Sequence, residues 1–140
     1  MYPTLIHEWF HEVWNRGDAN AARRLLATDG ILYNLDQEGH DFRGPEHFLE
    51  FFERYRGAFP DMEVTVEDVI QSGDTLAGRW SVKGTHRGAT LGFEATNRPV
   101  AIDGMSFCKV RDGKIVEGWN VFDTAAMMKQ LGFTMVPPKA

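Results

Sequence analysis

Apolar side chains recur at helical spacing in the first part of the chain, and this pattern predicts three helices. The first helix is expected over residues 4–16, with Gly17 as its end. Asp18 is a good N-cap for a second, short helix, which Gly30 would end. A third helix is expected to begin at Pro45, because proline suits the first helical position. The apolar stripe of the first helix consists of Leu5, Ile6, Trp9, Phe10, Val13 and Trp14.

From residue 62 onward the apolar period changes to about two residues, which is typical of strands. The Asp112–Gly113 pair between the last two of these segments predicts a type I′ hairpin turn. A terminal helix is expected over about residues 124–131. The expected strands cover residues 31–35, 62–71, 75–85, 99–110 and 115–122, with a polar turn at 36–40 and a loop at 87–98.

Helices first and an antiparallel meander afterwards favour the α+β class. We expect a cone-shaped, curved antiparallel sheet wrapped around the N-terminal helices, with residues 1–140 as a single domain. Core side chains would fill the closed end of such a cone, and its open end is a natural pocket for a small molecule.

Composition narrows the classes of function. The chain has 140 residues, 43% hydrophobic and 12% aromatic, so a single fold with a large aromatic interior is expected. A net charge of -5 offers no basic patch for nucleic acid, and no apolar run is long enough to span a membrane. The first residues lack the pattern of a signal peptide, which predicts a cytoplasmic protein. Cys108 is the single cysteine; this excludes an intrachain disulfide and a multi-cysteine metal site and favours a buried thiol.

Asp123 is the first candidate for chemistry, because it ends an apolar strand and precedes a helix. If pairing continues without interruption from the hairpin turn, Asp123 faces Ile102 and shares the apolar inner face with Trp119 and Val121. A desolvated carboxylate gains proton affinity and can serve as a general acid or base. The alternative is an N-cap of the following helix, a role that Thr124 could fill instead. Spacing alone leaves both roles open.

His86 is the second candidate. Alternation places it on the same strand face as Trp80, and an imidazole suits proton transfer or the polarisation of a carbonyl group. The alternative is a histidine that is hydrogen-bonded to the loop after it. His7 and His11 have the i, i+4 spacing of a metal-binding helix, but no third ligand is evident, so we expect a solvated face and no metal site.

Several aromatic side chains are expected in the core, and some of them must line any cavity. Tyr33 and Asn34 would supply polar contacts there. Asp103 falls on the face opposite to Asp123 unless a bulge at Gly104 rotates one of the two carboxylates inward. The candidate substrate-binding residues are Trp14, Tyr33, Asn34, Met105, Phe107 and Trp119.

Motifs along nearly the whole chain are similar to those of one known family. They are Trp14–Asp18, Arg43–Glu46, Ala58–Asp61, Gly84–Gly88, Asn97–Val100, Arg111–Glu117, Trp119, Asp123 and Lys129–Gly132. Together they resemble the SnoaL-like polyketide cyclases, a family of the nuclear-transport-factor-2-like or ketosteroid-isomerase-like cone fold. The chain departs from the family's pattern at Glu94–Arg98, where Pro-Pro-Thr-Gly-Arg is common, and at Tyr33–Asn34, where a histidine is frequent. Both departures fall where substrate specificity would be set.

The resemblance implies an intramolecular aldol-type ring closure, or related lyase or isomerase chemistry, without a metal or cofactor. The substrate would be small and hydrophobic or polyketide-like. Asp123 matches the position of the family's general acid/base, and His86 matches a pocket histidine. We also expect a homodimer that forms through the outer face of the sheet.

Other functions of the same fold stay open. The chain could be a non-catalytic binder of small molecules, an interaction domain or a dehydratase. It could also be an epoxide hydrolase, which would need Asp103, Arg98 and Asp123 to converge on a water molecule.

Overall fold

The structure is a computed structural model that describes residues 1–36 and 38–139. Its helices are α1 (Leu5–Glu8), α2 (Ala19–Leu25), α3 (Gly44–Ala58) and α4 (Thr124–Gln130), with a π-helical segment η1 (Trp9–Asn15) directly after α1. Its strands are β1 (Leu26–Tyr33), β2 (Phe42–Arg43), β3 (Glu63–Ser72), β4 (Thr75–Thr85), β5 (Pro99–Arg111) and β6 (Lys114–Phe122).

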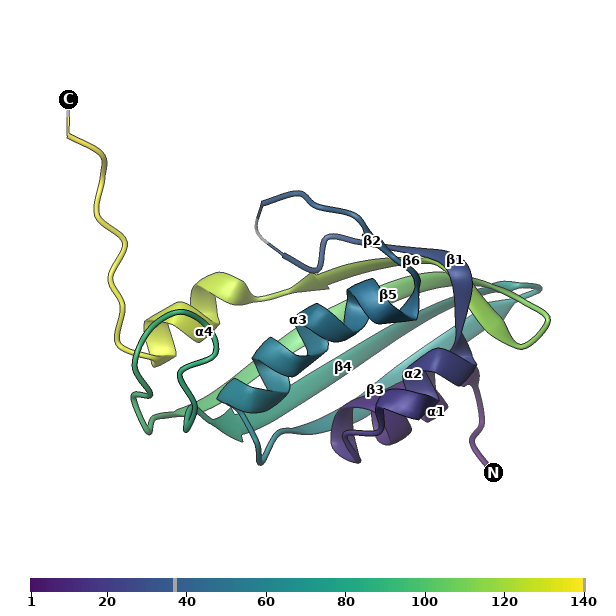
Figure 1. Cartoon of the computed structure of the whole chain (residues 1–140), viewed down its shortest axis with the longest axis horizontal. Coiled ribbons are helices and arrows are strands. Elements are labelled where there is room, and N and C mark those ends of the chain that lie inside the picture. The colour runs from purple at the N-terminus through teal and green to yellow at the C-terminus, as the bar shows by residue number, and fades with distance from the viewer. Residues whose placement is uncertain (37, 140) are drawn as a thin grey trace.

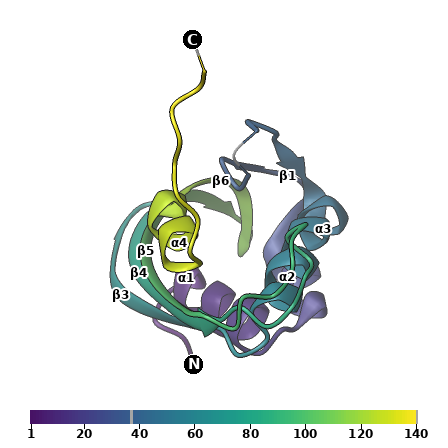
Figure 2. The ribbon, with the colours of Figure 1, turned by 90° about the vertical axis from the view of Figure 1, so that its left-hand side faces the viewer.

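The six strands form one curved, open sheet in the order β2-β1-β6-β5-β4-β3. Every neighbouring pair is antiparallel except β1 and β6, which run in parallel. Seen end-on, the sheet bends around an interior that α2, α3 and the N-terminal helices close on the other side (Figure 2). The expected α+β cone is therefore confirmed, with a mixed sheet in place of a purely antiparallel one.

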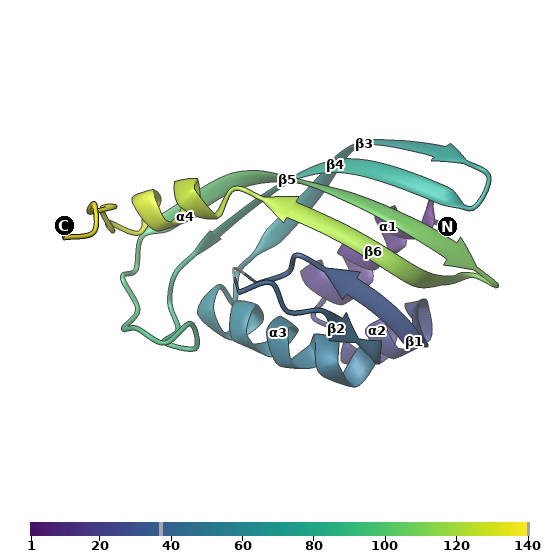
Figure 3. The ribbon, with the colours of Figure 1, turned by 90° about the horizontal axis from the view of Figure 1, so that it is seen from above.

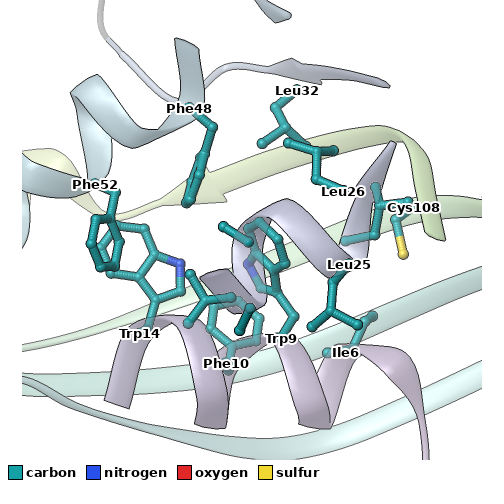
Figure 4. Packing of buried hydrophobic residues seen from close by; sticks show 14 of the residues in the cluster. Ile6, Trp9, Phe10, Trp14, Leu25, Leu26, Leu32, Phe48, Phe52 and Cys108 are labelled. Atoms are coloured by element: carbon teal, nitrogen blue, oxygen red, sulfur yellow. The ribbon is translucent and has the colours of Figure 1, made fainter. Parts of the chain in front are cut away.

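Helix α3 lies across the concave face of the sheet, while α4 and the loop of residues 86–98 lie together at one end of the molecule (Figures 1 and 3). The interior between these layers is aromatic (Figure 4). Trp14 meets Phe48 edge-on with ring centroids 5.8 Å apart, and Phe10 lies 5.1 Å from Trp80. Aromatic pairs at such distances add to the free energy gained by burial.

The first helix and the start of the second follow the sequence pattern. The apolar stripe of α1 and η1 is buried except for the half-buried Leu5. Arg16 N–H donates to the carbonyl of His11, five residues earlier, as in a π-helix. Asp18 caps α2 as expected, accepting N–H groups from Asn20 (2.9 Å) and Ala21 (3.3 Å). Asn15 exchanges two hydrogen bonds with the backbone of Val64 and so fixes the helical layer to the edge strand β3.

The chain between residues 25 and 44 differs from the expectation. Helix α2 ends at Leu25 rather than at Gly30, because Leu26 is fully buried and pairs with Ile115 of β6. The short strand β2 was not expected; it pairs with β1 after the polar turn, of which residue 37 lies outside the described part of the chain. Both differences arise because these strands pair with residues that are distant in the sequence. Local periodicity carries no information about such pairing.

The hairpin between β5 and β6 has the turn that the sequence predicts. Asp112 and Gly113 both have positive φ angles, 53° and 75°, as a type I′ turn requires, and Arg111 pairs with Lys114. The next pair, Val110 with Ile115, keeps this register, but Lys109 is then opposite Glu117, so that β6 contains an extra residue.

That extra residue is Val116, and it forms a β-bulge. Because side chains alternate with a period of two, the bulge reverses the faces of the rest of β6. The expected pairing of Gly104 with Val121 is wrong, since Gly104 is opposite Phe122. Asp123 consequently does not face Ile102. The side chains on the inner face of β6 also differ from those that the uninterrupted register predicts.

Within residues 1–36 and 38–139, no helix combines the length and the apolar content that crossing a bilayer requires.

Candidate functional site

An apolar cavity of about 120 Å³ lies between the concave face of the sheet, the N-terminal helices and α3. Its aromatic walls include Trp9, Phe10, Trp14, Phe48, Phe51 and Trp80. Ligand pockets commonly measure about 300–1,000 Å³. The cavity therefore accommodates about one ring, and a larger ligand must displace wall side chains or extend out of the cone.

One chain of hydrogen bonds crosses the inner face of the sheet beside this cavity. Trp80 Nε1 donates to Ser106 Oγ at 3.1 Å, and Ser106 Oγ lies 2.8 Å from Asn120 Oδ1. Asn120 Nδ2 in turn donates to the carbonyl of Tyr33 on β1, at 3.4 Å. Ser106 and Asn120 are direct partners in the β5–β6 register, and both line the cavity. A cavity that is mostly apolar but holds a few fixed polar groups is the usual form of a small-molecule site.

Gly104 makes room for this arrangement. A Cβ atom at residue 104 would overlap the indole ring of Trp80, which lies directly across the register from it. The indole can lie flat against β5 and reach Ser106 only because residue 104 has no side chain.

Two other side chains that line the cavity, Cys108 and Tyr55, are ionisable, and both are neutral at pH 7. Burial raises the pKa of the Cys108 thiol to about 11, so the buried thiol that the sequence favoured stays protonated and is no nucleophile at neutral pH. Burial also raises the pKa of the Tyr55 hydroxyl. Tyr55 packs on Phe51 at 4.6 Å and edge-on against Phe122, and it remains a neutral hydrogen-bond donor.

Asp123 lies outside the cavity lining. Its Oδ1 accepts the N–H of Ala126 at 2.9 Å, and the exposed side chain is the N-cap of α4. Thr124 does not take this role, because its hydroxyl donates to the carbonyl of Phe122 instead. Of the two roles that spacing left open, the cap is the one that the geometry shows. Asp123 nevertheless stands close to the site, between Phe122 and the helix that carries Met127, both of which line the cavity.

His86 is completely buried (0% exposed), but it does not line the cavity. Its Nδ1 accepts the backbone N–H of Thr96 at 3.1 Å, so the proton is on Nε2, which has no partner among the described residues. The ring packs against Phe59 and Phe93 at 5.5 and 5.2 Å. This is the histidine hydrogen-bonded to its own following loop that the sequence offered as the alternative.

The other predicted site residues divide between the two faces of the sheet. Trp14 lines the cavity, as expected. Tyr33 stacks on Trp119 with ring centroids 5.2 Å apart, and Trp119 meets Phe107 edge-on on the outer face. Phe107 borders the cavity through its strand but is 44% exposed, and Met105 and Val121 are 61% and 67% exposed. We call Tyr33, Met105, Phe107, Trp119 and Val121 the outer patch. Asn34 is exposed and lines no part of the cavity.

The relay that an epoxide hydrolase would need is not assembled. Asp103, Arg98 and Asp123 are exposed, and none of them lines the cavity. Among the described residues, no ion pair joins Arg98 to either carboxylate. The bulge is in β6 at Val116 rather than at Gly104, so neither carboxylate turns inward.

A separate group of ionisable side chains lies in the turn before β2. Asp36, Glu38 and His40 bring ligand atoms within 4.8 Å of one another. His40 Nδ1 is 2.7 Å from Asp36 Oδ2, and this hydrogen bond raises the pKa of His40. Glu38 and His40 are exposed and Asp36 is half-buried, and His40 is paired with both carboxylates, so the cluster is a group of surface ion pairs.

Sequence reasoning missed Asn120 and Tyr55 as cavity groups. One signal for Asn120 was present, because the uninterrupted register would place the charged Glu117 on the apolar face. Gly118 was a second signal, since a glycine inside a strand often marks a bulge or a close contact. It lies here against the side chain of Leu32, where a Cβ atom would come within 2.7 Å.

The comparisons with known proteins agree with this architecture. The sequence matches the family described as SnoaL-like polyketide cyclase over residues 4–131. IdmH from Streptomyces antibioticus, described as "a putative polyketide cyclase", is 33% identical over 92% of this chain and 96% of its own, with a TM-score of 0.78. AclR from Streptomyces galilaeus, described as "a putative hydroxylase", is 26% identical over 95% of this chain and 82% of its own, with a TM-score of 0.79.

A protein from Catenulispora acidiphila with a ketosteroid isomerase-like fold shares the fold at 19% identity, with a TM-score of 0.79 over 98% of this chain and 100% of its own. No protein of curated function matches the chain in sequence. The different descriptions of these similar structures show that the fold alone does not select one activity.

Proposed function

Because the chain belongs to the SnoaL-like polyketide cyclase family, we propose that it closes or isomerises a polyketide-like carbon skeleton by proton transfer, without a cofactor. The observation that carries this proposal is the apolar cavity with its single polar chain of Trp80, Ser106 and Asn120. Apolar walls fold a hydrophobic substrate and exclude water, which protects reactive carbonyl intermediates from side reactions.

Asp123 is the proposed proton acceptor. It occupies the position that the family resemblance assigns to the general acid/base, and it stands between two segments that line the cavity. Its Oδ1 accepts the Ala126 N–H, and no hydrogen bond among the described residues uses Oδ2. A carboxylate can therefore cap α4 with one oxygen and take a proton from a carbon acid at the cavity edge with the other.

His86 is proposed as a positioning residue in this reaction. It fixes the loop of residues 86–98, because its backbone and ring hold Arg98, Asn97 and Thr96. That loop lies at the same end of the cone as α4 (Figure 1). His86→Ala is expected to raise KM more than it lowers kcat, because the loop would no longer be held in place.

The experiment separates the two roles of Asp123. Partly cyclised and linear poly-β-ketone esters are incubated with the protein, and their conversion is followed by liquid chromatography and mass spectrometry. Asp123→Ser keeps a capping oxygen but removes the carboxylate, and Asp123→Ala removes both. We expect Asp123→Ser to lose activity by about 10²–10⁴-fold at an unchanged unfolding temperature. Full turnover by Asp123→Ser would refute the acid/base role.

A second candidate is a non-catalytic binder of small hydrophobic molecules. It is favoured by one observation: no carboxylate or imidazole of the described residues lines the cavity. The same assay decides, because a binder protects the ketone esters stoichiometrically, whereas an enzyme converts many equivalents.

We further propose that two copies associate through the outer patch. Its exposed apolar side chains are bordered on the same face by Arg79 and Lys109 and by Asp103 and Glu117. A two-fold arrangement brings the same patch of both copies together, and a border with both signs of charge allows opposite charges to meet.

Val121→Glu tests the dimer, because it places like charges near the two-fold axis. We expect a dimer for the wild type and a monomer for Val121→Glu in sedimentation velocity. Ile70→Glu is the matched control, since Ile70 is 70% exposed on the distant edge strand β3 and should leave the dimer intact. A monomeric wild type would refute the association.

A further inference from the structure

The hydrogen-bond chain in the cavity can run in one direction only. An indole N–H is a donor and never an acceptor, so Ser106 Oγ must accept from Trp80. Ser106 donates its single hydroxyl proton to Asn120 Oδ1. The other amide atom of Asn120 lies beside the carbonyl of Tyr33, which can only accept, so that atom is Nδ2 and the atom that faces Ser106 is Oδ1. The Tyr33 carbonyl and the Ser106 hydroxyl thereby determine which atom of the Asn120 amide is oxygen and which is nitrogen, an assignment that is otherwise ambiguous for asparagine.

With Oδ1 occupied by Ser106, the NH₂ group of Asn120 points away from it. One N–H reaches the carbonyl of Tyr33 at 3.4 Å, which is long for a hydrogen bond. No hydrogen bond among the described residues uses the second N–H. Asn120 borders a cavity whose other walls are mainly apolar, where an unpaired donor costs free energy. The cavity thus holds a donor whose orientation is fixed and whose partner is missing.

We propose that the Asn120 amide donates a hydrogen bond to a neutral carbonyl oxygen of the ligand, and that Trp80 and Ser106 act as positioning residues for it. This inference rests on the proposed function only in placing the ligand in this cavity. A carboxylate ligand fits less well, because Lys83 is the one cationic side chain among the described residues that line the cavity, and it is exposed. The cavity volume of about 120 Å³ suits an aryl or cyclic ketone.

The arrangement also suits the chemistry of enolisation. When a base removes a proton from the carbon next to a carbonyl group, negative charge develops on the carbonyl oxygen. A hydrogen bond from a fixed amide strengthens as this charge grows. Asn120 would therefore bind the ketone and stabilise its enolate, whichever group takes the proton.

The test uses two probes of nearly identical shape, acetophenone and 2-phenylpropene, in which a CH₂ group replaces the carbonyl oxygen. Their dissociation constants are measured from the fluorescence of the cavity tryptophans Trp9, Trp14 and Trp80. The carbonyl stretch of ¹³C-labelled acetophenone is recorded by infrared difference spectroscopy. The wild type is expected to shift the carbonyl band to lower frequency and to prefer the ketone over the alkene.

Three variants locate the donor. Asn120→Leu should abolish the band shift and reduce the ketone preference by about 2- to 10-fold, the range of one hydrogen bond. Ser106→Ala keeps Asn120 but frees its amide to turn, so a smaller and broader shift is expected. Tyr55→Phe is the control, because Tyr55 is another hydroxyl donor in the cavity and its loss should leave the shift intact. Circular dichroism confirms that each variant is folded, and Ser106→Ala covers the case in which Asn120→Leu is not.

Each outcome either supports or overturns the proposal. A shift that survives in Asn120→Leu, or that disappears in Tyr55→Phe, overturns the proposal, as does a wild type that binds neither probe. A shift that depends on Asn120 in a protein that converts no polyketide supports this inference and refutes the proposed catalysis. Turnover of a polyketide without an Asn120-dependent shift supports the proposed catalysis and refutes this inference.

Discussion

The two faces of the β5–β6 hairpin use the same strands for different purposes. The inner face presents Ser106, Cys108 and Asn120 to the apolar cavity, where an unpaired polar atom costs free energy. The outer face presents Met105 and Val121 to solvent, and both are more than half exposed. Ser106 and Asn120 inside and Met105 and Val121 outside are local departures from the usual arrangement of an antiparallel sheet, since Ile102 and Ile115 keep the rest of the inner face apolar.

These local departures indicate where we expect function on the molecule. Polar groups beside an apolar cavity are costly unless they are satisfied, and the half-buried Ser106 and Asn120 are the groups for which we propose ligand recognition. Exposed apolar side chains grouped on one face favour association with another surface, which is the basis of the proposed dimer. The bulge at Val116 separates the two, because it decides which residues of β6 face which side.

Insertion of one alanine between Lys109 and Val110 is expected to have the largest effect. The inserted residue gives Val116 a partner and removes the bulge. Uninterrupted pairing then places Ile115 and Asn120 on opposite faces, although both line the cavity in the wild type. One of them must leave the interior, so we expect no cooperative unfolding transition in thermal circular dichroism. Deletion of Val116 is the control and should unfold cooperatively, because it keeps Lys109 opposite Glu117 and leaves the faces unchanged. An insertion variant with native-like stability would show that the bulge does not determine the faces.

Gly104→Ala should destabilise the protein by about 1–3 kcal/mol through overpacking against Trp80. The indole cannot move away without losing its hydrogen bond to Ser106. Urea unfolding measures the loss. In a Trp80→Leu background the same glycine substitution should cost much less, since the overlapping ring atoms are absent. An equal cost in both backgrounds would contradict this explanation.

The pH dependence of stability should also distinguish the interior from the surface. Burial raises the pKa of Cys108 from 9.0 to about 11, so the folded protein holds this proton more tightly than the unfolded chain. The protonated thiol contributes fully to the free energy of unfolding below about pH 9. This contribution is lost as the pH rises through 11, and by pH 10.5 the loss is roughly 2 kcal/mol. Urea unfolding of wild type and Cys108→Ala at pH 8 to 10.5 measures the difference in slope. Parallel slopes would show that the thiol is not desolvated.

Asp123→Ala should have the smallest effect on stability, about 1 kcal/mol, which is typical for the loss of an N-cap. Asp123→Ser should retain most of this stability, because serine also caps well. Thermal unfolding of both variants gives the comparison. If serine costs as much as alanine, the carboxylate charge near the start of α4 matters more than its hydrogen bond to Ala126.

Local patterns were sufficient for much of the fold. The stripe from Leu5 to Trp14, the Asp18 cap and the Asp112–Gly113 turn each depend on neighbouring residues, and all three are present as predicted. The order of the helices and strands predicted the α+β cone, the family resemblance implied the same fold, and the comparisons confirm it. The candidate site was less predictable: of the six proposed binding residues, Trp14 lines the cavity and Phe107 only borders it.

What the sequence determined by itself was periodicity, turn chemistry and family, because these are encoded in short segments. The tertiary structure decided the extent of α2, the parallel pairing of β1 with β6 and, above all, the side of the sheet on which Asn120 and Asp123 lie. The unpaired residue Val116 reverses the side of the sheet on which the later residues of β6 lie. The position of this bulge is set by how β6 packs between β1 and β5. Strand faces therefore follow from the alternation of the sequence only after pairing with distant strands has fixed the register.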